Sequence, residues 1–282
     1  MVSSARQLFE QTYDRTEPRS YFRLLAPLDY RMPAVVGGYL ARHAPAMTAA
    51  RGKQALNVID FACGFGAIGL LLTHDLSLAE LYDHYASDPG EADPIDLDRR
   101  FFAARRRRPA LPLQVTGIDI AAHALAYAER VGALERGFAV NLLSDTPPPE
   151  LERRLGTADL VVESGAMGDL LAPAMARILD FGGQPWLLLA PRGDVDDRSL
   201  RTALADRGYR IEHCNHTPFR YRRFADPEEK ADVLAAAVAL GRRPDLWMDE
   251  SYFRINLWLA RPVADCAAIP IEGLRLQDDG TP

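Results

Sequence analysis

Short apolar segments alternate with helical patterns between residues 56 and 191, and this alternation limits the possible folds more than any other feature. The apolar segments are residues 56–61, 115–120, 138–143, 158–165 and 185–191. Between them, stretches such as residues 121–134 and 170–179 carry apolar side chains at helical spacing. Short apolar runs that are each followed by a helix are typical of βαβ units, in which helices cover both faces of a parallel sheet. We therefore expect one α/β domain of the Rossmann type.

The segments outside this alternation predict additions to one core. Residues 1–50 indicate helices broken by prolines, with a short helix that ends before Pro45. Residues 75–112 interrupt the alternation of apolar segments and helical patterns, and they predict a helical insert. The expected divisions are an N-terminal helical cap (1–50), a Rossmann-like domain with its insert (51–265) and a tail (266–282).

The region after residue 192 predicts more sheet. The expected elements are a helix over 199–207, a strand over 209–214, a helix over 227–240 and a closing strand over 252–262. These late strands should extend the sheet at one edge, the last of them antiparallel. The whole pattern predicts a mostly parallel seven-stranded sheet with helices on both faces.

Charge and composition narrow the classes of function. The 282-residue chain has a formal net charge of −6, which argues against nucleic acid as a partner. We interpret the run from Arg105 to Arg108 as a solvated helix end. Cys63, Cys214 and Cys266 have no metal-site spacing and fit a reducing cytoplasm. The N-terminus has no apolar core, and the sequence has no apolar run of membrane-spanning length. Both features likewise favour a cytoplasmic protein. The sequence leaves open whether the chain forms a homodimer.

The turn after the first apolar segment is the most specific motif. It reads Asp60-Phe-Ala-Cys-Gly-Phe-Gly66, and it lies where a strand is expected to pass into a helix. A turn that brings its backbone close to a ligand needs small residues at alternate positions. Ala62, Gly64 and Gly66 meet that need. The acid at the strand end distinguishes the motif from the dinucleotide pattern, in which a glycine follows the strand directly.

This arrangement resembles motif I of the class I S-adenosylmethionine (SAM)-dependent methyltransferases. In that family the loop lies under the methionine part of SAM, so the resemblance implies contacts from Asp60, Ala62, Gly64 and Gly66. The family usually has glycine where this chain has Ala62, and a methyl group is tolerable there if φ stays negative. The resemblance covers roughly residues 55–262 and implies fold and cofactor, not substrate.

Later strand ends add to the resemblance. The second strand ends in Asp119, which can accept two hydrogen bonds from a ribose diol. Without residues 75–112, its distance from Asp60 would be near the roughly 20 residues of a βαβ unit. We expect the third strand to end at Asn141-Leu142, where the family contacts adenine. The implied cofactor contacts after Asp60 to Gly66 are Asp119, Ile120, Asn141, Leu142 and Ser164. Purely structural alternatives remain for three of the residues: Asp60 as a helix cap, Asp119 as the start of the next helix and Asn141 as a turn residue.

Fewer residues are candidates for a catalytic role than for cofactor binding. Methyl transfer from a sulfonium needs mainly alignment and desolvation, with a base only for a protonated or weak acceptor. Glu163 follows the fourth strand and could be that base or bind an amine, while Tyr30, with Tyr21 and Phe22, could close over a sulfonium by cation–π attraction. His216 could accept a proton. The sequence shows no obvious metal site, so no metal is expected.

Several functions remain open. The first is methyl transfer to a small-molecule substrate. The second is a SAM cyclase reaction, in which the SAM amine attacks Cγ and yields azetidine-2-carboxylate and methylthioadenosine. The third is a binding protein without activity, against which Asp60, Gly64, Gly66 and Asp119 argue. A nicotinamide dehydrogenase is disfavoured because the glycine pattern is shifted.

Overall fold

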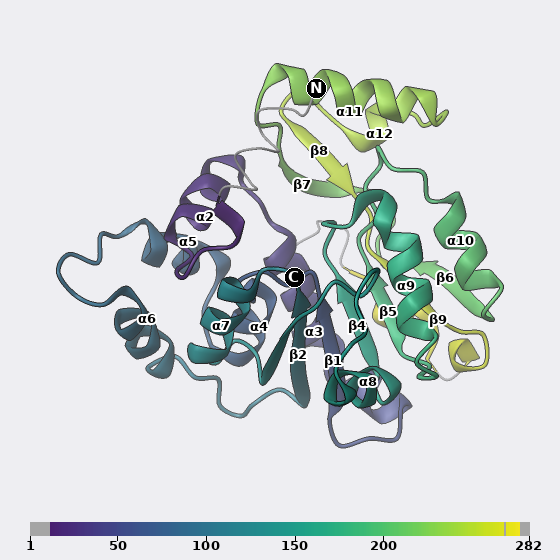
Figure 1. The fold of residues 1–282 in the computed structure, drawn as a ribbon. Coiled ribbons are helices and arrows are strands. Elements are labelled where there is room, and N and C mark those ends of the chain that lie inside the picture. Colours follow the sequence, from purple (N-terminus) through teal and green to yellow (C-terminus); the bar gives the residue numbers. More distant parts are fainter. Residues whose placement is uncertain (1–11, 268, 277–282) are drawn as a thin grey trace.

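The fold was analysed in a computed structural model, which describes residues 12–267 and 269–276. Its main sheet has seven strands in the order β3-β2-β1-β4-β5-β9-β6. Strands β1 to β5 pair in parallel, whereas β9 is antiparallel to both β5 and β6. The predicted mostly parallel, Rossmann-like sheet is therefore confirmed (Figure 1).

The strands of the main sheet are between four and seven residues long. They are β1 (Leu56–Phe61), β2 (Leu113–Asp119), β3 (Arg136–Ala139), β4 (Leu160–Glu163), β5 (Trp186–Leu189), β6 (Tyr209–His213) and β9 (Trp258–Pro262).

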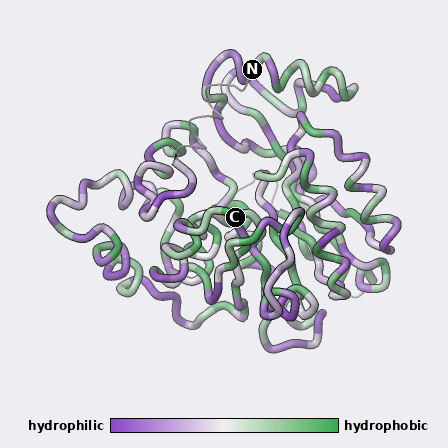
Figure 2. The backbone as a smooth tube through the Cα atoms, in the orientation of Figure 1, coloured by the Kyte–Doolittle hydropathy of each residue, from purple (hydrophilic) through white to green (hydrophobic). Residues whose placement is uncertain are grey.

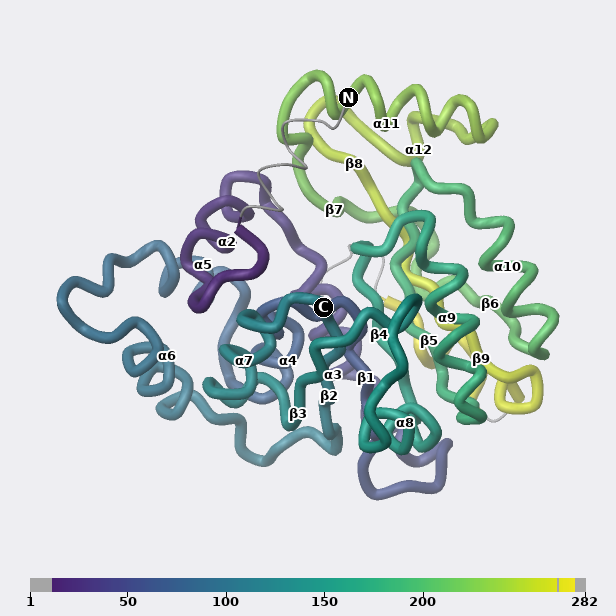
Figure 3. Tube along the Cα trace, viewed as in Figure 1, coloured from purple at the N-terminus to yellow at the C-terminus, as the bar shows by residue number. Residues whose placement is uncertain are grey.

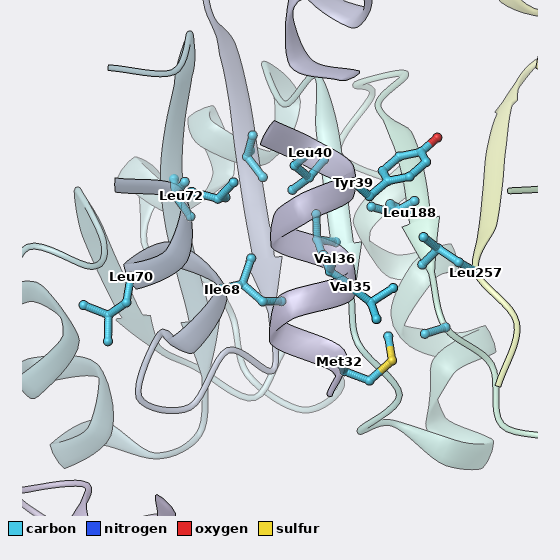
Figure 4. Close-up of a cluster of buried hydrophobic side chains, with 14 of the residues drawn as sticks. Met32, Val35, Val36, Tyr39, Leu40, Ile68, Leu70, Leu72, Leu188 and Leu257 are labelled. Atoms are coloured by element: carbon cyan, nitrogen blue, oxygen red, sulfur yellow. The ribbon is translucent and has the colours of Figure 1, made fainter. Parts of the chain in front are cut away.

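Helices cover both faces of this sheet because alternate strand residues point to opposite sides. On one face Val58 and Val162 pack with α3 (Met32–Ala50), α4 (Ala67–Thr73) and α7 (Ala122–Arg130). On the other face Ile59 and Val161 pack with α8 (Pro149–Gly156), α9 (Leu171–Leu179) and α10 (Arg198–Ala205). Figure 4 shows α3 with Val36 and other apolar side chains directed at its neighbours. Hydrophobic residues accordingly gather along the central strands (Figure 2).

Helix α3 differs from its prediction. It continues through Pro45 to Ala50 instead of ending before the proline. A proline removes one hydrogen bond and disfavours a helix interior, but Tyr39, Leu40 and Met47 of α3 are fully buried on the sheet. Burial of this face outweighs the local preference. The division of the chain at residue 50 stays a prediction.

Two segments rise beyond the carboxyl ends of the parallel strands (Figures 1 and 3). One contains α2 (Arg19–Leu25) together with α5 (Leu78–Ala86) from the insert, which also holds α6 (Pro94–Ala103). The other is a two-stranded sheet of β7 (Phe219–Arg223) and β8 (Tyr252–Ile255), accompanied by α11 (Pro227–Ala239) and α12 (Pro244–Trp247). We call this second segment, residues 214–257, the hairpin insert.

The hairpin insert corrects the prediction of one closing strand over 252–262. The stretch is split into β8 and β9 at Asn256-Leu257. The buried side chain of Asn215 binds both sides of the break: its Oδ1 accepts from the Leu257 N–H at 2.8 Å, and its Nδ2 donates to Asn256 Oδ1 at 2.8 Å. These bonds satisfy polar groups at the break, and the chain can therefore leave one sheet for the other.

A buried aspartate joins the N-terminal helix to the insert and the core. Asp98 of α6 accepts hydrogen bonds from Arg19 (3.2 and 2.7 Å), from His84 Nε2 (2.7 Å) and from Tyr127 Oη (2.8 Å). Its burial would raise its pKa, but these hydrogen bonds hold the pKa below its ordinary value. Asp98 therefore stays charged and connects α2, α5, α6 and α7.

No helix in the described part of the chain is both long enough and apolar enough to cross a membrane.

Candidate functional site

The turn after β1 adopts a conformation that normally requires glycine. Ala62, Gly64 and Gly66 all have positive φ, at 58°, 51° and 70°. The condition under which a methyl group would be tolerated at Ala62, a negative φ, is therefore not met. An alanine in this left-handed region is strained by about 1–2 kcal/mol, so the turn holds Ala62 in the conformation for which the related motif uses glycine.

The two glycines serve different contacts. A Cβ at Gly64 would lie 3.1 Å from the hydroxyl of Tyr13, so this glycine faces the N-terminal segment. A Cβ at Gly66 would lie 3.1 Å from the Cβ atoms of Ala128 and Ala133, so this glycine faces the core. The turn thus presents its backbone at Gly64 toward the carboxyl edge of the sheet.

Asp119, at the end of β2, fastens this turn. Its Oδ2 accepts from the Gly64 N–H at 2.7 Å and from the Tyr13 hydroxyl at 2.8 Å, and its Oδ1 accepts from the Ala121 N–H at 2.9 Å. The predicted site residues Gly64 and Asp119 are therefore brought together. In this conformation Asp119 supports the loop and also binds a phenol.

Tyr13 was missed as a site residue by sequence reasoning, because the N-terminal segment carries no motif. Burial, and secondarily the negative charge of Asp119, raises the pKa of Tyr13 well above its ordinary value, so it stays a neutral donor. Its neighbour Asp14 accepts from the backbone N–H of His123 at 2.9 Å, at the start of α7. The segment is thereby anchored over the ends of β1 and β2.

Two further carboxylates lie at the same edge. Asp60 of β1 is 2% exposed and Glu163 of β4 is fully buried. Within the described residues, Asp60 Oδ2 and Glu163 Oε2 have no hydrogen-bond partner. Burial raises the pKa of Asp60 to about 8, with further increases from the charges of Asp119 and Glu163. Uncompensated buried carboxylates of this kind suit a cationic ligand.

Glu163 is held rigidly by the turn that follows it. Its Oε1 accepts from the backbone N–H groups of Gly165, Ala166 and Met167 at 2.9, 2.5 and 3.1 Å. Burial raises the pKa of Glu163 to about 7, although these N–H groups act in the opposite direction. The arrangement fixes one oxygen and leaves the other buried without a hydrogen-bond partner among the described residues.

Tyrosine rings from the two covering segments meet above the turns. Tyr21 lies 5.4 Å from Phe65 between ring centroids, and Tyr30 lies 5.4 Å from Tyr221 of β7. The Ser164 hydroxyl interacts with that of Tyr30. A Cβ on Gly165 would lie 3.3 Å from the Tyr221 ring. Tyr221 was missed because it lies in the hairpin insert, whose β7 strand was not predicted.

The remaining predicted cofactor contacts, Ile120, Asn141 and Leu142, lie in three different environments. Ile120 follows Asp119 and is 71% exposed, so it offers an apolar surface beside the carboxylate. Strand β3 ends at Ala139, and the prediction that it continues to Asn141-Leu142 is wrong. Asn141 lies instead in a turn, where its Oδ1 accepts from the Leu143 N–H at 3.1 Å. Leu142 is 2% exposed and belongs to the core.

Two other predicted site residues, His216 and Phe22, do not lie with the buried acids and the tyrosines above them. His216 is exposed and lies 2.8 Å from Arg275 Nη1. Phe22 stacks on Tyr85 with centroids 4.4 Å apart and is a core residue. No group of three or more His, Cys, Asp or Glu side chains within residues 12–267 and 269–276 is arranged to hold a metal ion.

Comparison with known proteins gives structural similarities only. No protein-family model matches the chain, and no curated protein matches its sequence. Magnesium protoporphyrin IX methyltransferase from Synechocystis PCC 6803, solved with bound SAM, is similar with 12% identity over 91% of each chain and a TM-score of 0.38. A TehB-like SAM-dependent methyltransferase from Corynebacterium glutamicum has 16% identity over 76% of this chain and 85% of its own, with a TM-score of 0.37. The plantazolicin methyltransferase BpumL, in complex with SAH, has 9% identity, 92% and 91% coverage, and a TM-score of 0.41.

Proposed function

We propose that the chain binds SAM at the carboxyl ends of β1, β2 and β4 and transfers its methyl group to a small molecule. The observation that carries this proposal is the convergence of Asp60, Asp119 and Glu163 beside a turn with three positive-φ residues. The ammonium group of SAM would compensate the unpartnered Asp60 Oδ2, and its sulfonium would add a second positive charge at this acidic edge. The motif resemblance and the sheet order support the same ligand.

Each part of the site has a proposed task. The turn at Ala62, Gly64 and Gly66 would lie against the methionine part, and Asp60 would receive the ammonium group. Asp119 would receive the ribose diol through charge-assisted hydrogen bonds. Ile120 offers an apolar surface for adenine, and the exposed turn at Asn141 could hydrogen-bond the ring. Leu142 would act only as support, since it is buried.

The tyrosines would exclude water and stabilise positive charge. Tyr21, Tyr30 and Tyr221 present aromatic rings near the buried acids, and a cation over such a ring gains roughly 0.5–2 kcal/mol. SAM, once bound, supplies an electrophilic methyl carbon with a good leaving group. The protein's own contribution is alignment and a water-poor environment. His216 has no task in this proposal, because it lies beside Arg275.

The reaction itself is tested by its product. The purified protein is incubated with SAM, with and without a mixture of small-molecule acceptors, and the nucleosides are identified by mass spectrometry. S-adenosylhomocysteine that forms only with acceptors supports methyl transfer. Methylthioadenosine formed from SAM alone would replace this proposal with the cyclase reaction that yields azetidine-2-carboxylate. A cytoplasmic location and a homodimer stay predictions from the sequence.

Binding is tested separately by titration calorimetry. We expect Asp119→Ala to weaken SAM binding by about 1–3 kcal/mol, because charge-assisted hydrogen bonds are lost. Asp206→Ala, which changes an exposed aspartate at the end of α10, should bind SAM like the wild type. Circular dichroism checks that both variants are folded. Unchanged affinity in a folded Asp119→Ala variant would refute the ribose contact.

A further inference from the structure

A pocket lies beside Glu163, on the side of the sheet edge that faces α9 and α10. Its empty space, which includes open solvent, is about 340 Å³, with about 20 Å³ of room for the centres of water-sized groups, and its wall includes Gly165 from the turn after β4 and Pro191 and Arg192 from the segment after β5. Glu163 also raises the pKa of Asp60 through its charge, which places it close to the proposed SAM site. Glu163 therefore belongs to both the pocket and the cofactor edge.

More negatively than positively charged side chains line this pocket. Four carboxylates line it, from Glu163, Asp169, Asp196 and Asp197, against the one guanidinium of Arg192. Arg192 is engaged through two nitrogens by Asp194, including a 3.0 Å bond from Nε. Its guanidinium is therefore not free to bind an anionic substrate.

Two of the four carboxylates are also engaged. Asp196 pairs with Arg198 at 2.6 Å, and Asp197 pairs with Arg201 at 3.0 Å and with Arg242 at 3.2 Å.

Glu163 and Asp169 remain as the acids of the pocket that form no ion pair among the described residues. Asp169 is exposed, so solvent can satisfy it. Glu163 is fully buried, and its Oε2 has no partner among the described residues. A polar atom that is buried without a partner costs free energy, which a ligand with a hydrogen-bond donor and positive charge would recover. A carboxylate ligand would instead add a like charge.

We propose that the methyl acceptor is an amine, bound in this pocket with its nitrogen at Glu163 Oε2. The proposal rests on the SAM-dependent methyl transfer proposed above. Glu163 Oε1 is fixed by three backbone N–H groups, so Oε2 has a defined position from which to orient the nitrogen.

Glu163 also gives the leaving proton a destination. The bound ammonium first passes one proton to Glu163 Oε2, which frees the nitrogen lone pair. The lone pair forms the new N–C bond as the C–S bond breaks, and the electron pair of that bond stays on sulfur. The methylated nitrogen leaves as a cation with its two remaining protons, and Glu163 releases its proton to solvent. The raised pKa of Glu163, about 7, suits a group that accepts and releases a proton near neutral pH.

The test compares probes that share a carbon skeleton. Butyl-, hexyl-, benzyl- and phenethylamine are compared with the matching alcohols and carboxylates, first by calorimetric binding to the protein alone and then by methyl transfer from isotope-labelled SAM. At least one amine should bind about tenfold or more tightly than its matched alcohol and carboxylate. The same amine should be methylated.

Variants assign this preference to Glu163. Glu163→Gln keeps an oxygen for the three N–H groups but removes the charge, so it should bind amine and alcohol within about twofold of each other. Glu152→Gln, which changes an exposed residue of α8, should keep the wild-type preference. Circular dichroism and SAM titration establish that both variants are folded.

Three outcomes would overturn the proposal. They are the absence of any amine preference in the wild type, a preference for alcohols or carboxylates, and an amine preference that survives Glu163→Gln. If SAM still binds in these cases, only the acceptor class is wrong. If the wild type does not bind SAM, the proposed function itself fails.

Discussion

At the scale of the residue, Ala62 is the clearest departure from what its surroundings require. Its φ of 58° lies in the left-handed region, where glycine has no penalty and alanine does. Neighbouring constraints hold it there, since the Ala62 N–H donates to the Ile118 carbonyl at 2.8 Å. The backbone of the turn therefore keeps the shape of the motif although one glycine is missing.

This strain predicts that Ala62→Gly stabilises the protein. Glycine removes a cost of about 1–2 kcal/mol in the folded state but adds about 0.5–1 kcal/mol of entropy to the unfolded state. We expect a net gain of up to about 1.5 kcal/mol in the free energy of unfolding, measured by urea denaturation. Gly64→Ala, at an equally left-handed position, is the matched reverse change and should destabilise. A loss of stability in Ala62→Gly would contradict the strain.

At the scale of the element, the N-terminal segment before α2 covers the proposed cofactor site. The Tyr13 hydroxyl occupies Asp119 Oδ2, the atom proposed for the ribose diol. The segment is anchored at Asp14 and, through Arg19 and Asp98, at α6. Ribose and the phenol would compete for one acceptor, so SAM binding requires Tyr13 to move from Asp119.

This competition predicts that Tyr13→Phe binds SAM more tightly. The variant keeps the ring but loses a hydrogen bond to a charged group, which is worth about 1.5–3 kcal/mol at most. We expect the dissociation constant for SAM, measured by calorimetry, to fall about three- to tenfold. Tyr82→Phe, in which a hydroxyl bond to the Tyr30 carbonyl is lost instead, serves as the control. Weaker binding by Tyr13→Phe would mean that its hydroxyl contacts SAM directly.

At the scale of the whole molecule, three strands bring buried acids to one edge. Asp60, Asp119 and Glu163 come from β1, β2 and β4, and the N-terminal segment and the hairpin insert cover them. Because burial raises the pKa of Asp60 to about 8 and that of Glu163 to about 7, the folded protein binds protons that the unfolded chain releases above about pH 4. These two groups therefore reduce stability as pH rises from about 4 to 8.

The same shifts predict that SAM binding releases protons. A cationic ligand favours the ionised carboxylates, so affinity should rise with pH from about 6 to about 7.5. Calorimetry at pH 7 in two buffers of different ionisation enthalpy measures the protons released. Asp60→Asn should release fewer protons than the wild type. Net proton uptake in the wild type would show that the carboxyls do not meet the cation.

Periodicity in the sequence determined the central sheet, because buried parallel strands and their helices leave a local pattern. The turn from Asp60 to Gly66 and the acid at Asp119 were likewise visible, since their chemistry depends on position along a strand. Where the pattern depended on distant partners, prediction failed: α3 passes through Pro45, β3 ends before Asn141, and Asn215 divides the last strand.

Only the tertiary structure decided which side chains meet at the carboxyl edge. Tyr13 and Tyr221 come from distant parts of the chain and belong to no local motif. His216 lies beside Arg275 instead of at the site. The unpartnered oxygens of Asp60 and Glu163 are also tertiary facts, because a hydrogen-bond deficit depends on everything packed around an atom. The sequence showed the acids near the ends of β1, β2 and β4, whereas packing determined what surrounds them.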